Sequence, residues 1–199
     1  MPHQLALTAP LTLAQRLVLG ATSLFGWEVH VEEPLPRQCV IVGAPHTTNW
    51  DLIAALALRG ATGYHFNWVA KDAIFKGPGD WFFRKLGGIP VNRRSKNNFV
   101  DQMVAAFAEK KDMLLAIAPQ GTRSLQTHWR SGFYHMAQGA GIPIALGYAD
   151  YVKKIVGIGP VMHPTGDLYA DFERIKAFYA DIKGRHPQLN GEIRLREKE

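Results

Sequence analysis

Short apolar runs that alternate with helical patterns are the feature that most constrains how this chain can fold. Runs typical of strands occur at residues 39–43, 66–70, 113–118, 142–147 and 155–161, with a weaker one at 89–91. Apolar residues at helical spacing fall between most of these runs, most clearly at 98–111 and 167–183. Strands that alternate with helices predict an α/β fold with a largely parallel central sheet flanked by helices. In such folds the functional groups usually lie in loops at strand ends.

Length and composition favour one domain. The chain has 199 residues, of which 47% are hydrophobic, and a chain of this size buries a core without disulfide or metal staples. Its glycines and prolines are spread along the sequence, so we expect a single domain over residues 1–199. The single cysteine, Cys39, lies beside an apolar run and is expected to be a small buried side chain in a reducing compartment.

The net charge of +6 favours an anionic partner, such as a membrane surface, a phosphorylated substrate or nucleic acid. Acidic residues are interspersed with the basic ones and no nucleic-acid motif is recognisable, so we expect no nucleic-acid partner. Residues 11–26 contain an apolar stripe that predicts an amphipathic helix, either packed on the domain or lying in a membrane interface. Neither a secretory signal nor an apolar span of ~20 residues is present, which favours a cytoplasmic protein.

A histidine and an aspartate follow the first clear strand. His46 and Asp51 are separated by about 140° on a regular helix, so they can meet only if His46 stands outside it, as Pro45 and the polar residues 47–49 favour. A neutral histidine can take a proton from an attacking hydroxyl while a carboxylate fixes its tautomer. An isolated histidine before a helix would be better explained as part of the helix cap.

Three further blocks change that interpretation. They are GGIPVNRRS at residues 87–95, PQGTRS at residues 119–124 and GIPI at residues 141–144. In this order, and together with the His-x4-Asp pair, they resemble the blocks of the lysophosphatidate and glycerol-phosphate acyltransferases. The resemblance covers about residues 40–150, with weaker similarity over 151–184. It implies the glycerol-phosphate acyltransferase-like fold.

The resemblance also implies a reaction. A fatty acyl group would pass from acyl-CoA or acyl-carrier protein to a hydroxyl of a lysolipid acceptor such as 1-acyl-glycerol-3-phosphate. His46 would be the general base and Asp51 its partner, with no covalent enzyme intermediate. Because the chain is basic and its acceptor a lipid, we expect it on the cytoplasmic face of an anionic membrane, as a peripheral protein.

Substrate-binding residues follow from the same resemblance. It assigns Arg93 and Arg123 to the acceptor's phosphate, which guanidinium groups bind in a fixed geometry. Lys71, at the end of the strand 66–70, is expected to stabilise the oxyanion of the tetrahedral intermediate. Gly121 and Thr122 either direct backbone N–H groups at that oxygen or a phosphate, or simply form a tight turn.

Gln120 departs from the family pattern, which has glutamate at this position. An amide carries no charge and cannot act as a base. Gln120 is therefore expected to contact the acceptor, whose identity stays open between lysophosphatidate, another lysophospholipid and a phosphate-free acceptor such as an amino-acid lipid. A lipid-binding homologue without turnover is the alternative function.

The remaining patterns exclude several functions. No serine stands in a nucleophile-elbow context, which disfavours a lipase-type hydrolase. The nucleotide-binding and zinc-site motifs are missing, so we expect no metal or cofactor. Several aromatic side chains either belong to the core or line an acyl groove or membrane contact: Trp50, Trp68, Trp81, Phe82, Phe83 and Trp129.

Overall fold

Strand β3 (Gln38–Ala44) lies inside the sheet and is buried on both of its faces. Val40 and Val42 contribute to one hydrophobic core, while Cys39 and Ile41 contribute to a second core on the opposite side. Side chains alternate between the two faces of a strand, so a strand covered on both sides has a continuous apolar sequence. The computed structural model describes residues 3–91 and 99–195.

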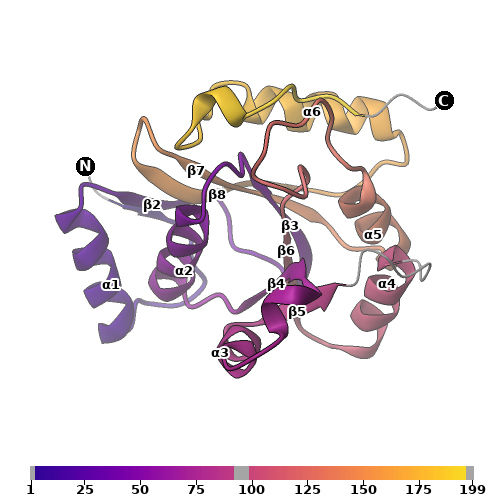
Figure 1. Cartoon of the computed structure of the whole chain (residues 1–199). Coiled ribbons are helices and arrows are strands. Elements are labelled where there is room, and N and C mark those ends of the chain that lie inside the picture. Colours follow the sequence, from indigo (N-terminus) through magenta and orange to yellow (C-terminus); the bar gives the residue numbers. More distant parts are fainter. Residues whose placement is uncertain (1–2, 92–98, 196–199) are drawn as a thin grey trace.

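Eight strands within the described residues form one sheet (Figure 1). In spatial order they are β1 (Gln4–Leu5), β2 (Glu28–Val31), β8 (Ile155–Met162), β7 (Ile144–Asp150), β3, β6 (Met113–Ile117), β4 (Phe66–Lys71) and β5 (Gly88–Val91). Neighbouring strands are parallel except for β7 and β8, which are antiparallel. The prediction of an α/β fold with a largely parallel sheet is confirmed, although β1 and β2 were not predicted.

Helices cover both faces of this sheet (Figure 1). One core contains residues from α4 (Phe99–Glu109), α5 (Gly132–Ala140) and α6 (Leu168–Tyr179), and the other contains residues from α1 (Leu13–Leu24) and α2 (Trp50–Thr62). Both helices predicted from the clearest periodicity are present but shorter than expected. The helix predicted over 167–183 begins after Asp167, because this side chain accepts hydrogen bonds from Tyr169 and Ala170 N–H as an N-cap.

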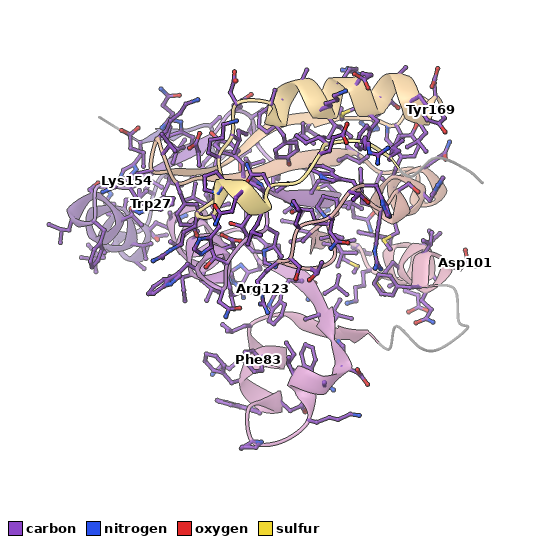
Figure 2. All side chains as sticks on the ribbon, turned by 45° about the horizontal axis from the view of Figure 1, so that its top comes forward. Trp27, Phe83, Asp101, Arg123, Lys154 and Tyr169 are labelled. Carbon is purple, nitrogen blue, oxygen red and sulfur yellow. The ribbon has the colours of Figure 1, made fainter. Side chains whose placement is uncertain are left out.

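A smaller unit projects from the β4–β5 edge of the sheet and contains α3 (Asp80–Lys85) with the 3₁₀ turn η1 (Asp72–Phe75). Figure 2 labels Phe83 of α3, whose ring lies 6.1 Å from that of Trp68 on β4. Its neighbours Trp81 and Phe82 are 69% and 51% exposed. Of the aromatic run in this unit, only Phe83 therefore packs inward.

Helix α1 carries apolar residues both on the side that packs on the domain and on its exposed side. Leu19 is buried in the core beneath it, where α1 packs on α2. Leu13, Leu17 and Leu24 are 75%, 66% and 88% exposed, and their spacing places them on one stripe. None of the described helices combines the length and apolarity that a membrane crossing needs.

The parallel arrangement determines where the functional residues meet. Strands β3, β4, β6 and β7 run in the same direction, so their carboxyl ends lie at one edge of the sheet. The loop with His46 follows β3, the block with Gln120 follows β6, and Tyr151 follows β7. Segments that are far apart in the sequence are therefore brought together at this edge.

Candidate active site

The loop between β3 and α2 carries the histidine and aspartate of the sequence motif. It begins at the cis Ala44–Pro45 bond and leads into Trp50, the first residue of α2. His46 therefore stands before the helix, as contact with Asp51 requires. Its Nδ1 lies 3.0 Å from Oδ2 of Asp51. The structure thus brings the two predicted catalytic residues together.

The Asp51 carboxylate organises this loop. Its Oδ2 accepts hydrogen bonds from the backbone N–H groups of Thr47 and Thr48, at 2.9 and 3.1 Å, as well as contacting His46. Its Oδ1 accepts a hydrogen bond from the Tyr151 hydroxyl at 2.8 Å. Asp51 also lies in the first turn of α2, where the helix dipole favours a negative charge. These interactions hold the carboxylate in one position.

The contact with Asp51 decides which nitrogen of His46 is available as a base. A carboxylate accepts hydrogen bonds, so a neutral imidazole beside it carries its proton on Nδ1 and keeps a lone pair on Nε2. The His46 side chain is 29% exposed, and Nε2 has no hydrogen-bond partner in the described part of the chain. A histidine in this position can take a proton from a hydroxyl that approaches from outside.

Tyr151 is a residue of this site that the sequence motifs did not identify. Burial and the hydrogen bond to Asp51 raise the pKa of its hydroxyl, so the group stays protonated and donates to the carboxylate. The ring of Trp27 supports it edge-on, with the centroids 5.0 Å apart. The one signal in the sequence was its position four residues after the predicted strand 142–147, close to where groups from neighbouring parallel strands converge.

Gln120 is 2% exposed and joins two separate segments of backbone. Its Oε1 accepts a hydrogen bond from His46 N–H at 2.7 Å, and its Nε2 donates to the carbonyl oxygen of Asn190 at 2.8 Å. Both ends of the amide are therefore used inside the protein. A glutamate carboxylate would match His46 N–H but would face the Asn190 oxygen without a proton to donate. The departure from the family glutamate thus has a structural reason in this chain.

The rest of this block forms a turn that reaches the loop between β3 and α2. Gly121 has φ +68°, and its N–H donates to the Ala118 carbonyl at 3.0 Å, so this N–H is occupied by the turn. Thr122 Oγ1 accepts from Ser124 N–H at 3.4 Å. Arg123, which is labelled in Figure 2, is exposed and donates a hydrogen bond to Asn49 Oδ1. The structure therefore places Gln120 and Arg123 against the loop of His46.

Two other predicted substrate-binding residues have no described side chain. Lys71 is the last residue of β4, and only its backbone is described, while Arg93 lies outside the described residues. Across residues 3–91 and 99–195, no three His, Cys, Asp or Glu side chains gather in an arrangement suited to a metal ion.

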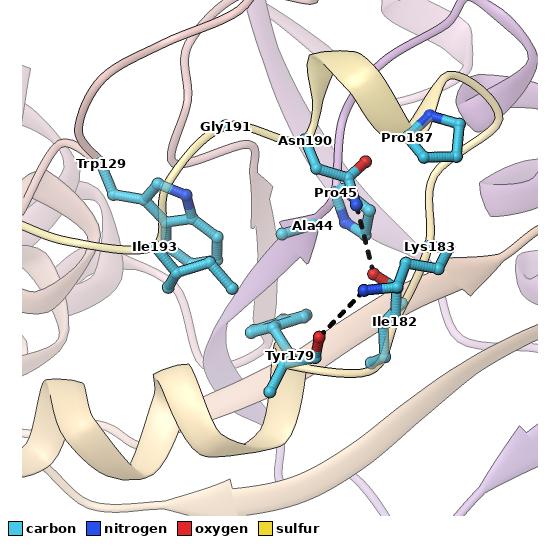
Figure 3. Close-up of a pocket in the computed structure, with 11 residues that line it drawn as sticks. Ala44, Pro45, Trp129, Tyr179, Ile182, Lys183, Pro187, Asn190, Gly191 and Ile193 are labelled. Carbon is cyan, nitrogen blue, oxygen red and sulfur yellow. Dashed lines mark hydrogen bonds between the residues drawn. The ribbon is translucent and has the colours of Figure 1, made fainter.

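A cavity of about 250 Å³ lies beside the start of the loop between β3 and α2 (Figure 3). Ala44 and Pro45 form one wall, and the other lining residues come from the segment around Trp129, the end of α6 and the C-terminal segment. Lys183 and Asn190 contribute polar groups to the lining, and most of the other lining residues are apolar. Trp129, one of the aromatic residues expected in the core or an acyl groove, is 2% exposed, belongs to the core and also lines this cavity.

Replacing Gln120 by glutamate tests the bridging role. Above about pH 5 the introduced carboxylate would leave the Asn190 oxygen unpaired, so we expect a loss of about 1–3 kcal/mol in the free energy of unfolding. The loss should shrink below about pH 4, where the carboxyl is neutral in both states and can donate a proton. Gln138→Glu, the same change on an exposed side chain, is the control for chemical denaturation curves. Equal stability of the two variants at neutral pH would contradict the bridge.

Comparison with known proteins agrees with this geometry. The family model described as Acyltransferase matches residues 26–145, which is more than half of the chain. No curated protein sequence matches the chain. The crystal structure of the 1-acyl-sn-glycerophosphate (LPA) acyltransferase from Thermotoga maritima is similar in fold, with a TM-score of 0.54 and 17% identity, over 86% of this chain and 80% of that one. With its fold and the family match in agreement, the chain belongs to the acyltransferase family.

Proposed function

We propose that this protein is an O-acyltransferase that moves a fatty acyl group from acyl-CoA or acyl-carrier protein to a hydroxyl of a lysophospholipid such as 1-acyl-glycerol-3-phosphate. The observation that carries this proposal is the hydrogen bonding of Asp51. By accepting from His46 Nδ1, it leaves Nε2 as the free base at the exposed side of the loop. The chain's membership of the acyltransferase family supports acyl transfer as the reaction.

In the proposed reaction, His46 Nε2 removes the proton of the acceptor hydroxyl as its oxygen attacks the thioester carbonyl. A tetrahedral intermediate forms, and its negative oxygen requires nearby donors. Lys71 is proposed for this role, together with the N–H of Thr122. Collapse of the intermediate breaks the carbon–sulfur bond, and the imidazolium returns its proton to the departing thiolate. The products are an ester and a free thiol, and the histidine is neutral again.

Arg123 and Arg93 are proposed to bind the phosphate of the acceptor. Support for Arg123 comes from its hydrogen bond to Asn49, the residue just before α2, which holds the guanidinium beside the catalytic loop. A guanidinium forms stronger, charge-assisted hydrogen bonds with phosphate than with neutral groups. The name of the structurally similar Thermotoga maritima enzyme gives 1-acyl-sn-glycerophosphate as its substrate, which makes lysophosphatidate the first acceptor to examine.

A graded set of variants tests the mechanism. Replacing His46 by alanine should lower acyl transfer by about 10²-fold or more, because the general base is lost. Asp51→Asn should also be severe, since the oriented carboxylate is lost, whereas Tyr151→Phe should be milder because three donors to Asp51 remain. The measurement is thiol release together with labelled ester formation from purified protein.

His163→Ala, which removes an exposed histidine after β8, is the matched control and should retain normal turnover. Turnover of His46→Ala close to that of the unmodified protein would refute the mechanism. Binding of lysolipid by the unmodified protein without any transfer would instead favour the lipid-binding function.

We further propose that the protein acts at the cytoplasmic face of an anionic membrane, with the exposed leucine stripe of α1 in the lipid interface. The stripe is apolar, and the net charge of +6 favours anionic lipid. Vesicles with anionic lipid should co-sediment the protein at low salt, and high salt should weaken this binding. A Leu17→Gln/Leu24→Gln variant should bind less than the Val152→Gln control, which changes a 72% exposed residue elsewhere. Identical sedimentation of the two variants would contradict the assignment of α1.

A further inference from the structure

The segment after α6 lies outside the residues that match the family model, yet it contacts the neighbours of His46 and Asp51. The carbonyl of Lys183 accepts a hydrogen bond from Tyr151 N–H at 2.9 Å. His186 N–H donates to Thr47 Oγ1 at 3.3 Å. The chain is therefore fixed on both sides of Arg185, once to the tyrosine that binds Asp51 and once to the loop of His46.

Gly184 shows how closely this segment approaches the loop. A Cβ at this position would lie 2.8 Å from Thr47 Oγ1 and 2.9 Å from Asn190 Oδ1, which is closer than side chains pack. The short 3₁₀ turn η2 (Pro187–Leu189) begins three residues after Gly184. The carbonyl of Asn190, just after this turn, accepts the hydrogen bond from Gln120. The backbone that carries Arg185 thus has one defined position at the site.

The Arg185 side chain extends over the start of α2. Its Cζ lies 5.2 Å from the ring centroid of Trp50, an exposed indole between His46 and Asp51 in the sequence. Burial and the Asp51 hydrogen bond raise the pKa of Tyr151, and the charge of Arg185 is close enough to oppose that rise. Stacking on an indole limits the freedom of the guanidinium but leaves its N–H edge available for other contacts.

Arg123 contacts Asn49, the residue just before Trp50, by donating a hydrogen bond to its Oδ1. Two guanidinium groups from different parts of the chain therefore rest on successive residues, Asn49 and Trp50, next to the catalytic pair. Among the described residues, neither arginine forms an ion pair with a carboxylate. Surface arginines are ordinarily solvated, but these two are both positioned by the catalytic loop.

We propose that Arg185 is a substrate-binding residue that, with Arg123, recognises a phosphate group of the substrate beside His46. This inference rests on the proposed acyl transfer and adds to it a cation from outside the family blocks. A phosphomonoester of the acceptor is the expected ligand, because a lysophosphatidate places its phosphate close to the hydroxyl that must reach His46. The phosphates of a CoA donor offer the same chemistry, so the test must separate the two substrates.

The experiment compares Arg185→Gln with Lys111→Gln, which removes the same charge from an exposed residue just before β6. For Arg185→Gln we expect the acceptor KM for lysophosphatidate to rise about tenfold or more, as for loss of a charge-assisted hydrogen bond. The donor KM should stay within about twofold, and monoacylglycerol, which lacks phosphate, should show no such rise. Arg185→Lys should recover part of the loss, since it keeps the charge without the planar fork.

Direct binding separates failure of this inference from failure of the proposed function. Calorimetric titration of a short-chain lysophosphatidate should show the same weakening for Arg185→Gln, whether or not the protein turns over. Normal transfer with an unchanged acceptor KM would overturn the role of Arg185 while leaving acyl transfer intact. A rise confined to the donor KM, or an equal rise with monoacylglycerol, would also overturn it. Arg185-dependent binding without transfer would support Arg185 and refute the proposed function.

Discussion

The hydrogen bonding of the Asp51 carboxylate is the interaction on which the rest of the site depends. Its donors are His46, the two threonine N–H groups that follow it, and Tyr151, the residue just after β7. One charged group thus holds the loop between β3 and α2 in shape and links it to the residue that follows a neighbouring strand. If a buried donor to a charged group is removed, the free energy of unfolding falls by more than the net contribution of the hydrogen bond, because the charge is left without a partner. The surroundings of Asp51 therefore tolerate little change. The same carboxylate determines the tautomer of His46.

Further hydrogen bonds to backbone groups join the surroundings of Asp51 to the segment after α6. Gln120 connects His46 N–H to the Asn190 carbonyl, and Lys183 connects to Tyr151 N–H. The segment from Lys183 to Asn190 therefore helps to hold the residues of the site in place. A neutral side chain that both donates and accepts is required at residue 120, because it lies between a backbone donor and a backbone acceptor. The amide is consistent with a working site, and no loss of function needs to be assumed.

Much of the fold could be predicted from the sequence, because strands buried on both faces have continuous apolar runs. The weak run at residues 89–91 proved to be strand β5, and His46 lies outside the helix as its spacing from Asp51 required. The roles of Tyr151 and Arg185 could not be predicted in this way. Their partners, Asp51 and Trp50, are more than 90 positions away, and the segment around Arg185 has no periodic pattern. Gln120 was recognised as a departure, but its reason depends on Asn190, 70 positions further on.

The proposed mechanism differs from that of a serine hydrolase triad in one respect that can be measured directly. In the proposed mechanism the histidine–carboxylate pair activates no protein nucleophile, so the acceptor hydroxyl itself would attack the thioester while both substrates are bound. Two measurements test this claim. The first is the initial rate while the concentrations of both substrates are varied, and the second is the intact-protein mass after exposure to the donor alone. Direct attack by the acceptor predicts intersecting reciprocal plots and an unchanged protein mass. Parallel plots, together with an added acyl mass on the protein, would contradict it.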